Sequence, residues 1–381
     1  MGWWGVTMHL DCKLSIAFGL LLTWSGCSKE YEIIPTAPEV DPGAVMECPF
    51  TPISDTKMSV YDCNPVFDGT GESWGESVGS VGFYANSVLG HSFYQIWYSG
   101  SEDSDEIGGD WGVGTAISSN GTDWEPHPEN PLLESIEDAW NQDGMSAMQV
   151  VRDSAKDQYV MAYQGYLLDE GILGLGVATS SDGVRWEQHE DNPVVDLSAD
   201  HDGLNWCWPL GIAANERGGI TGYLGGGESG STFGTPVCNV YRAQVSDLSD
   251  WDILDDPALE AGPESYDQAG VSAASVVKAG DTHYMFYVGF SDWEPISIGG
   301  FDYIVPTNQT LNLATSTSGI SWTKHPDNPL PVHLTPEGNV TGVAAQVVDT
   351  RIHLWITDEY EELGRSAVGY YYYEPEIADH P

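Results

Sequence analysis

The chain has 381 residues, of which 41% are apolar, so it can bury a large hydrophobic core and does not have the composition of a disordered protein. Its 58 acidic residues against 12 basic ones give a formal net charge of -46, which excludes nucleic acid and anionic membrane as partners because both would be repelled. The acidic residues are spread along the chain, which is typical of a solvated acidic surface suited to salty surroundings.

The first residues predict export. Lys13 precedes an apolar run at 14–24 that is too short to span a bilayer and fits the core of a signal peptide. Ser25 and Gly26 then stand before Cys27, an ending that resembles a bacterial lipobox except that Trp24 replaces its usual Leu. The resemblance implies lipidation of Cys27 and a cell-envelope lipoprotein, on the outer membrane or the surface. The alternative is ordinary cleavage nearby and secretion.

We therefore divide the chain into a signal peptide (1–26), a lipid-anchored tether (27–45) and a folded domain (46–381), and expect contact with a membrane only through the lipid. Four cysteines remain in the domain, namely Cys48, Cys63, Cys207 and Cys238. An even number in an exported chain predicts two disulfides, and three pairings are possible. We favour the local one, Cys48 with Cys63 and Cys207 with Cys238.

One pattern recurs along the domain, which indicates a repeat architecture. Each copy has a small-residue strand, a polar turn, a Trp and an Asn-Pro or Asp-Pro. Copies are "AISSNGTDWEPHPENPLL" (116–133), "ATSSDGVRWEQHEDNPVV" (178–195), the diverged "AQVSDLSDWDILDDPAL" (243–259) and "ATSTSGISWTKHPDNPLP" (314–331), and "NPVF" (64–67) keeps only the last part.

Two further strands are predicted in each unit, because period-2 alternation and aromatic or β-branched residues are typical of strands. Small-residue segments lie at 78–84, 145–151, 208–214, 271–277 and 341–348, and aromatic segments lie at 94–100, 159–165, 220–226, 283–289 and 352–358. Four strands per unit and five units predict an all-β fold, a five-bladed β-propeller of four-stranded blades. The last unit lacks its Trp strand, so we expect the N-terminal segment around 61–67 to complete the last blade and close the ring.

The phrase "ATSSDGVRWEQHEDNPVV" resembles the outer strands of five-bladed propeller glycosidases of the arabinanase, β-xylosidase and β-fructosidase type. The resemblance covers about residues 61–373. It implies glycoside hydrolysis by acidic residues on the inner strands of the first three blades.

Five loops lead into the inner strands, and in a propeller they gather at one end of the axis. We call them the mouth loops: 68–77, 134–144, 196–208, 260–270 and 332–340. Glycoside hydrolysis needs two carboxyl groups, one to protonate the leaving oxygen and one to activate water or attack. Glu76 and Asp143 match the acidic positions of the first two blades, whereas Cys207 stands where the third blade of the similar families has an acid. Two nearby acids are candidates to replace it, Asp202 and Glu228, and we assign Asp202 as catalytic.

Substrate binding is assigned to aromatic and acidic side chains of the same end, because aromatic faces stack on sugar rings and carboxylates bind hydroxyls. These are Trp74, Trp140, Trp206, Trp208, Glu228, Asp267 and Glu337. The alternative for the Trp residues is packing between blades. For Glu76 and Asp143 the alternative to catalysis is a ligand-binding, Ca²⁺-binding or merely solvated role.

We expect no required cofactor, although clustered carboxylates at 101–106 and 200–202 make a Ca²⁺ site possible. The function that we expect is a glycoside hydrolase acting on a poly- or oligosaccharide, as a monomer. Two alternatives stay open, a glycan-binding propeller without catalysis, which Cys207 favours, and a protein-interaction propeller.

Overall fold

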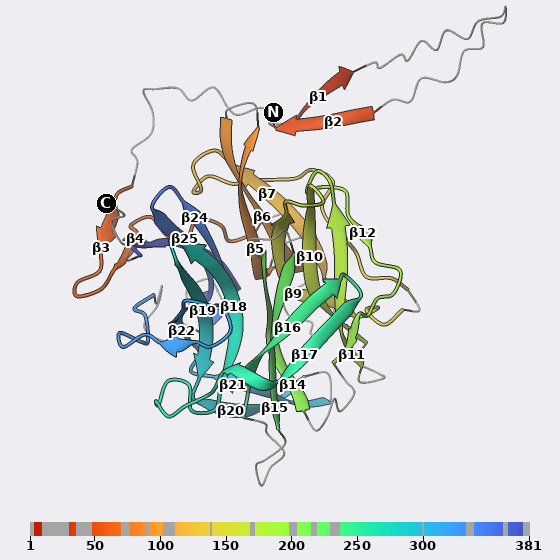
Figure 1. Ribbon diagram of the computed structural model, residues 1–381. Coiled ribbons are helices and arrows are strands. Elements are labelled where there is room, and N and C mark those ends of the chain that lie inside the picture. Colours follow the sequence, from red (N-terminus) through yellow and green to blue (C-terminus); the bar gives the residue numbers. More distant parts are fainter. Residues whose placement is uncertain are drawn as a thin grey trace, which may run out of the picture.

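The computed structural model describes residues 4–9, 30–35, 48–69, 77–88, 91–101, 111–137, 139–167, 172–197, 204–214, 219–228, 237–298, 301–332, 339–360 and 365–375. All regular structure in this part of the chain is β-strand, as the sequence predicts (Figure 1). None of the described segments is a helix long and apolar enough to cross a membrane.

Five antiparallel sheets form the body of the molecule, and each is one blade. From the inside outward, blade 1 consists of β5 (Ser77–Val88), β6 (His91–Ser101), β7 (Gly112–Ser118) and β8 (Glu125–Pro126). Blade 2 consists of β9 (Gly144–Asp153), β10 (Gln158–Leu167), β11 (Ile172–Ser180) and β12 (Glu187–Gln188), with β13 (Val195–Asp196) also on β11. Blade 3 consists of β14 (Leu204–Ala214), β15 (Ile220–Glu228), β16 (Asn239–Asp247) and β17 (Asp250–Leu259).

Blade 4 consists of β18 (Gly270–Ala279), β19 (Thr282–Phe290), β22 (Thr310–Ser316) and β23 (Thr323–Lys324). Blade 5 consists of β24 (Val340–Val348), β25 (Arg351–Tyr360), β26 (Arg365–Tyr373), β4 (Met58–Tyr61) and β3 (Phe50–Pro52). Two hairpins lie outside the blades, β20 (Asp292–Ile298) with β21 (Phe301–Thr307) inside the blade 4 segment, and β1 (Trp4–His9) with β2 (Glu30–Pro35) in the predicted signal and tether region.

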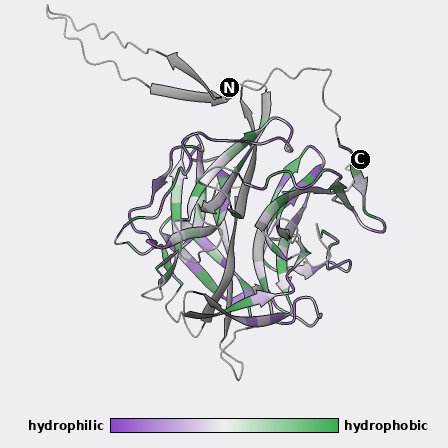
Figure 2. Cartoon of the chain, turned by 180° about the vertical axis from the view of Figure 1, so that it is seen from behind, coloured by the Kyte–Doolittle hydropathy of each residue, from purple (hydrophilic) through white to green (hydrophobic). Residues whose placement is uncertain are grey.

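The blades form a closed ring. The inner strands contact one another in the order β5, β9, β14, β18, β24 and back to β5. Each junction between adjacent blades contains its own cluster of buried apolar side chains, and hydrophobic residues follow the strands of the blades (Figure 2). The prediction of a five-bladed β-propeller is confirmed.

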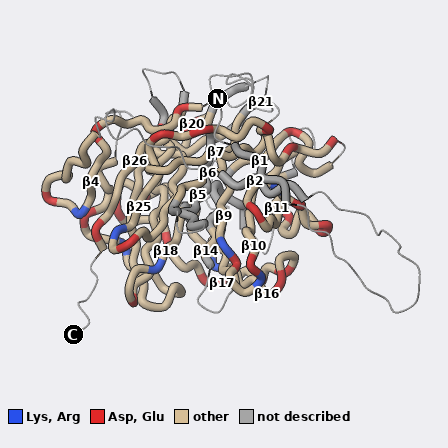
Figure 3. The backbone as a smooth tube through the Cα atoms, turned by 90° about the horizontal axis from the view of Figure 1, so that it is seen from above, with Lys and Arg blue, Asp and Glu red and all other residues tan. Residues whose placement is uncertain are grey.

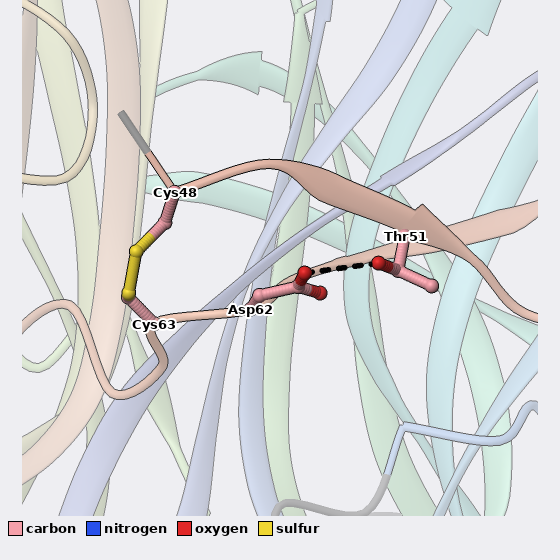
Figure 4. The surroundings of a disulfide bond; sticks show 4 residues. All are labelled: Cys48, Thr51, Asp62 and Cys63. Carbon is pink, nitrogen blue, oxygen red and sulfur yellow. Dashed lines mark hydrogen bonds between the residues drawn. A yellow bond between two sulfur atoms is a disulfide. The ribbon is translucent and has the colours of Figure 1, made fainter. Parts of the chain in front are cut away.

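The N-terminal segment completes the last blade, as predicted, but the strand lies earlier than expected. β4 pairs with β26, with Val60 opposite Tyr371, and β3 adds a fifth strand outside it. The predicted segment 61–67 continues along the same edge, where Phe67 bridges Val368 and Asn64 bonds to the backbone of Tyr370. The Cys48–Cys63 disulfide, which was predicted, ties the two ends of this hairpin together (Figure 4).

The Asn of the repeated Asn-Pro takes the place of a fourth-strand residue. Its amide accepts from the backbone N–H of one third-strand residue and donates to the same residue's C=O, as Asn130 does with Thr115, Asn192 with Val177 and Asn328 with Leu313. The fourth strands β8, β12 and β23 are therefore only two residues long. Blade 3 has Asp256 at this position, which lacks the amide donor, and there the fourth strand β17 is ten residues long and pairs with β16 at six positions.

In blades 1, 2 and 4 the polar turn and the Trp of the motif contact the preceding blade of the ring. In blade 2 the Gly183 carbonyl accepts a hydrogen bond of 2.7 Å from Trp97 Nε1 of blade 1, and Trp186 packs edge-on against the same indole. Blade 1 uses Gly121 and Trp124 on Trp355, and blade 4 uses Gly319 and Trp322 on Tyr223. The motif is thus part of the junctions between blades.

Candidate functional site

The five inner strands all begin at the same end of the ring, the mouth, because every blade is an antiparallel meander of the same orientation. Parallel bridges of Trp111 with Gly144 and of Cys238 with Gly270 join neighbouring blades where β9 and β18 begin. Further along the inner strands, Gln149 Nε2 donates to the Val343 carbonyl (3.3 Å), which connects blade 2 to blade 5 past blade 1. Ser275 Oγ accepts from the N–H of Ala345. These hydrogen bonds join inner strands of different blades near the axis.

Asp143 directly precedes β9 at this mouth. Its N–H donates to the Tyr166 carbonyl (3.1 Å), and its side chain is half-buried. The Tyr166 hydroxyl lies over Gly144, where a Cβ would come within 2.6 Å of it. Burial, and secondarily the charge of Asp143, raises the pKa of Tyr166 above its ordinary value, so this phenol, which is protonated at neutral pH in any case, stays protonated at higher pH as well. The Asp143 carboxylate and the Tyr166 phenol thus lie near each other where the inner strand of blade 2 begins.

Trp140 packs on its own blade. Its ring stacks on Tyr163 at 5.9 Å between centroids and lies over Gly165 and Gly174, where any Cβ would come within 3 Å of the indole. The side chain keeps partial exposure. These contacts fit the packing alternative, and a stacking contact with sugar stays a prediction.

Asp267 is fully buried, at 0% exposure, and its Oδ2 lies 2.6 Å from Lys324 Nζ. Tyr287 donates to the same carboxylate oxygen at 3.3 Å, and Lys324 also donates to the Gly262 carbonyl. Burial raises the pKa of Asp267, while the bond and charge of Lys324 oppose the rise. In this structure the side chain holds the fourth mouth loop onto blade 4, and its contact with substrate stays a prediction.

Several predicted residues lie outside the described residues, namely Glu76, Asp202, Trp74, Glu337 and Cys27. For Trp206, Cys207, Trp208 and Glu228 only the backbone is described. The backbone of Glu228 pairs with Leu204 at the start of β14, which places it at the mouth end of blade 3. Cys238 is buried and disulfide-bonded, and its predicted pairing with Cys207 stays a prediction.

Two buried amides near the mouth were missed by sequence reasoning. Asn141 is 0% exposed, and neither its Nδ2 nor its Oδ1 has a hydrogen-bond partner among the described residues. Gln164, 4% exposed, has an unpartnered Oε1. Buried polar atoms are normally satisfied, so these amides mark places for water or a bound polar group. The signal for Asn141 was its place beside Asp143 in "WNQDG".

A groove of about 440 Å³ lies away from the mouth, between blade 4 and the closing strand of blade 5. Its lining contains hydroxyl side chains such as Thr315 and Ser316, together with His325, Tyr373 and Lys57, and no carboxylate. Glycoside hydrolysis needs carboxyl groups, so we do not assign the reaction to this groove.

No group of three or more His, Cys, Asp or Glu side chains that could hold a metal ion is present within the described ranges. Residues 200–202 and most of 101–106 lie outside those ranges, so the possible Ca²⁺ site stays a prediction.

No protein-family model matches the chain, and neither does any curated protein. Solved structures do match. A glycosyl hydrolase from Bacteroides ovatus aligns with a TM-score of 0.58 at 14% identity, over 83% of this chain and 92% of its own. The chain shares its fold with glycoside hydrolases.

Two further structures agree. One is a structure of the GH130 family of mannoside phosphorylases, which contains glycoside hydrolases that target β-1,2 mannosidic linkages in Candida mannan (TM-score 0.57, 15% identity, 87% of this chain and 95% of that one). The other is the β-1,2-mannobiose phosphorylase from Listeria innocua in complex with β-1,2-mannobiose (TM-score 0.57, 12% identity, 83% and 96%). The resemblance to five-bladed glycosidases is confirmed at the level of the fold.

Proposed function

We propose that this protein is a glycoside hydrolase whose reaction takes place at the mouth of the propeller. The observation that carries the proposal is Asp143, a half-buried carboxylate at the start of the blade 2 inner strand, near the buried phenol of Tyr166, whose pKa burial raises. The fold supports it, because the structural neighbours are glycan-acting propeller enzymes.

In the proposed mechanism Asp143 and Glu76 form the carboxyl pair. One protonates the glycosidic oxygen while the other activates water or attacks the anomeric carbon. Asp202 is the third acidic residue, in place of the acid that Cys207 replaces in blade 3. Tyr166, as a neutral phenol, is suited to orient Asp143.

The proposed setting is the cell envelope. The segment ending at Cys27 motivates a lipid-anchored, exported monomer, which works on carbohydrate outside the cell, and we propose neither nucleic acid nor direct membrane contact.

The test is release of reducing sugar from a broad glycan panel by wild type, Asp143→Asn and Glu76→Gln. We expect each variant to lose about 10³-fold or more in kcat, because each removes one of the two groups that the reaction needs. Asp191→Asn is the control, an exposed carboxylate in the outer turn of blade 2, and should keep wild-type activity. Turnover that survives in Asp143→Asn would remove the proposal.

A second function, glycan capture without hydrolysis, is favoured by Cys207 at the position of the third acid. It predicts that wild type binds panel glycans, for example in affinity electrophoresis, yet releases no reducing ends. In that case Asp143→Asn would change affinity by a modest factor and abolish no reaction.

A further inference from the structure

The junction between blades 4 and 5 differs from three of the others. At those three the repeated turn places a Gly and a Trp against the preceding blade, nine and six residues before the Asn of Asn-Pro. Counted back from Asn64 in the same way, the turn before β4 has Asp55 and Met58 at these positions. Asp55 keeps the positive φ of the glycine, at 63°, but Met58 is smaller than Trp. The closing segment therefore brings less side-chain volume to this junction than the repeated turn brings elsewhere.

The groove of about 440 Å³ lies at this junction. Blade 4 contributes side chains of β19, β22 and β23 and of the turn between the last two, and blade 5 contributes Lys57 and Tyr373. Tyr284, Thr315 and Thr323 form a row across the groove, because they lie directly opposite one another in the pairing of the three strands. β18 begins at the mouth, so the start of β19 and the end of β22, which line the groove, lie at the opposite end of the ring.

Hydroxyl groups dominate the lining of the groove. Five of them make no hydrogen bond to another described residue, namely those of Thr282, Thr315, Thr317, Ser321 and Thr323. All five side chains are at least partly exposed. Each hydroxyl can both donate and accept a hydrogen bond, so together they offer a ligand an array of groups of both kinds.

The lining also lacks carboxylates, in a chain that is rich in them. Along the described chain Asp and Glu far outnumber Lys and Arg (Figure 3). Blades 1 and 2 have Glu125 and Glu187 at the repeat position of Thr323, and each has a charged residue where blade 4 has Ser321. Of the residues that line the groove, Lys57 alone carries a permanent charge. Blade 4 thus has hydroxyls instead of charges at two positions that line the groove.

We infer that this groove is a second carbohydrate site, which binds a short segment of a neutral glycan and does not cleave it. Its volume falls within the range of small-molecule sites, roughly 300–1,000 Å³, but such sites are mostly apolar. A lining of hydroxyls instead suits a ligand whose own groups both donate and accept hydrogen bonds, as the hydroxyls of a sugar ring do.

Other occupants fit the groove less well. The exposed side chains of its lining are Thr317, Ser321 and Thr323, all polar, whereas the core of a protein interface is apolar and aromatic. An acidic glycan would find one ammonium group there and would meet the net negative charge of the whole molecule. Hydrolysis needs carboxyl groups that the lining does not have, so the site is independent of the reaction proposed at the mouth.

Affinity electrophoresis tests whether the protein binds such glycans. The probes are dextran, galactomannan, linear arabinan and soluble β-glucan, with polygalacturonate as the acidic comparison. All proteins carry Asp143→Asn, which keeps the probes intact under the proposed function. We expect at least one neutral probe to retard the protein and polygalacturonate not to retard it.

Two groove variants and one control connect the binding to the groove. Thr315→Val/Thr323→Val removes two hydroxyls of the row and keeps the shape of both side chains, so affinity should fall about tenfold. Thr323→Glu, which restores the residue of blades 1 and 2, should weaken binding as well, because its longer side chain occupies the groove. The control Thr179→Val/Glu187→Gln changes the same two repeat positions in blade 2 and should bind like the parent.

Hydrogen exchange then locates the site. A hexasaccharide of the retarding glycan should slow exchange in β22, β23 and the turn between them, in the parent and the control but not in the two groove variants. Unchanged exchange there in the parent, equal protection in the groove variants, retardation by polygalacturonate, or no retardation by any neutral probe would each overturn the inference. The sugar-release assay is unaffected by these outcomes, so the proposed hydrolysis and the groove site can fail separately.

Discussion

At the scale of single residues, blades 2 and 4 have different side chains at one set of equivalent repeat positions. In blade 4, Tyr287 bonds to Asp267, which pairs with Lys324 of β23. In blade 2 the equivalent residues are Tyr163, Asn141 and Gln188, and the Tyr163 hydroxyl donates to Gln188 Oε1 at 2.8 Å. The blade 4 version is ionic and the blade 2 version neutral, although the fold around them is the same.

This difference predicts how blade 4 responds to substitution. Lys324→Gln leaves the Asp267 charge buried and unpaired, so we expect a loss of about 3–5 kcal/mol in the free energy of unfolding. The double variant Asp267→Asn/Lys324→Gln copies blade 2 and should recover most of that loss. Urea denaturation of the three proteins measures both effects.

The pH dependence provides a control. Without Lys324, burial raises the pKa of Asp267 further, so the folded state binds a proton more readily than the unfolded chain. The loss caused by Lys324→Gln should thus be largest at pH 8 and should shrink as pH falls and Asp267 becomes protonated. A loss equal at pH 8 and pH 5, or a double variant no better than the single one, would contradict this account.

At the scale of elements, the repeated turn is where blades meet. Gly183 has φ of 77°, and a Cβ there would lie 3.0 Å from the Trp97 ring to which its carbonyl is bonded. The junction of blades 2 and 3 lacks this device, since Ala162 occupies the position of Trp97 and blade 3 has the diverged turn. At the junction where the turn has diverged, its aromatic partner on the neighbouring blade is also absent.

Gly183→Ala tests the junction against a matched glycine. Gly262 also has positive φ, 62°, but a Cβ there would meet nothing within 4 Å. Gly262→Ala should cost only the backbone penalty, about 1–2 kcal/mol, while Gly183→Ala should cost that penalty and about 1 kcal/mol more for displacing Trp97. Thermal and urea unfolding compare the two, and equal losses would show that the indole contact contributes nothing.

The same elements show how far the sequence could predict the fold. Asn-Pro, Gly and Trp recur in the amino-acid sequence at regular spacing. The number of units, the order of the blades and the closure of the ring could therefore be predicted. The two-residue length of β8, β12 and β23 could not be predicted. In the sequence, an Asn whose amide bonds to a strand backbone cannot be distinguished from an Asn in a loop. The burial of Asp267 was hidden for a related reason, since its partner Lys324 lies far along the chain. The hairpin β20–β21 was not predicted, although the sequence has Gly-Gly between its two strands.

At the scale of the whole molecule, stability depends on the ring staying closed. Each blade buries apolar side chains against two neighbours, so opening the ring between blades 5 and 1 exposes the cluster that contains Phe67, Tyr98 and Trp355. The closing segment is short, because β4 pairs with β26 over only three residues. Aromatic packing supports it, with Phe50 of β3 within 5.0 Å of the Tyr370 and Tyr372 rings, measured between centroids.

The Cys48–Cys63 disulfide fixes this hairpin, and its removal tests how much the closure depends on it. The bond joins residues 15 apart, for which the chain-entropy model gives a stabilisation of about 3 kcal/mol. Cys48→Ser/Cys63→Ser should therefore lower the free energy of unfolding by about that amount, measured by urea denaturation. Thr51→Val is the control, because it removes only the exposed hydrogen bond to Asp62 across the same hairpin and should change stability by at most about 0.5 kcal/mol (Figure 4).

If the ring closes mainly through the disulfide, the double variant should also expose β26 to hydrogen exchange well before the other third strands. Uniform exchange across all five blades would instead show that the aromatic contacts of Phe50 hold the ring without it.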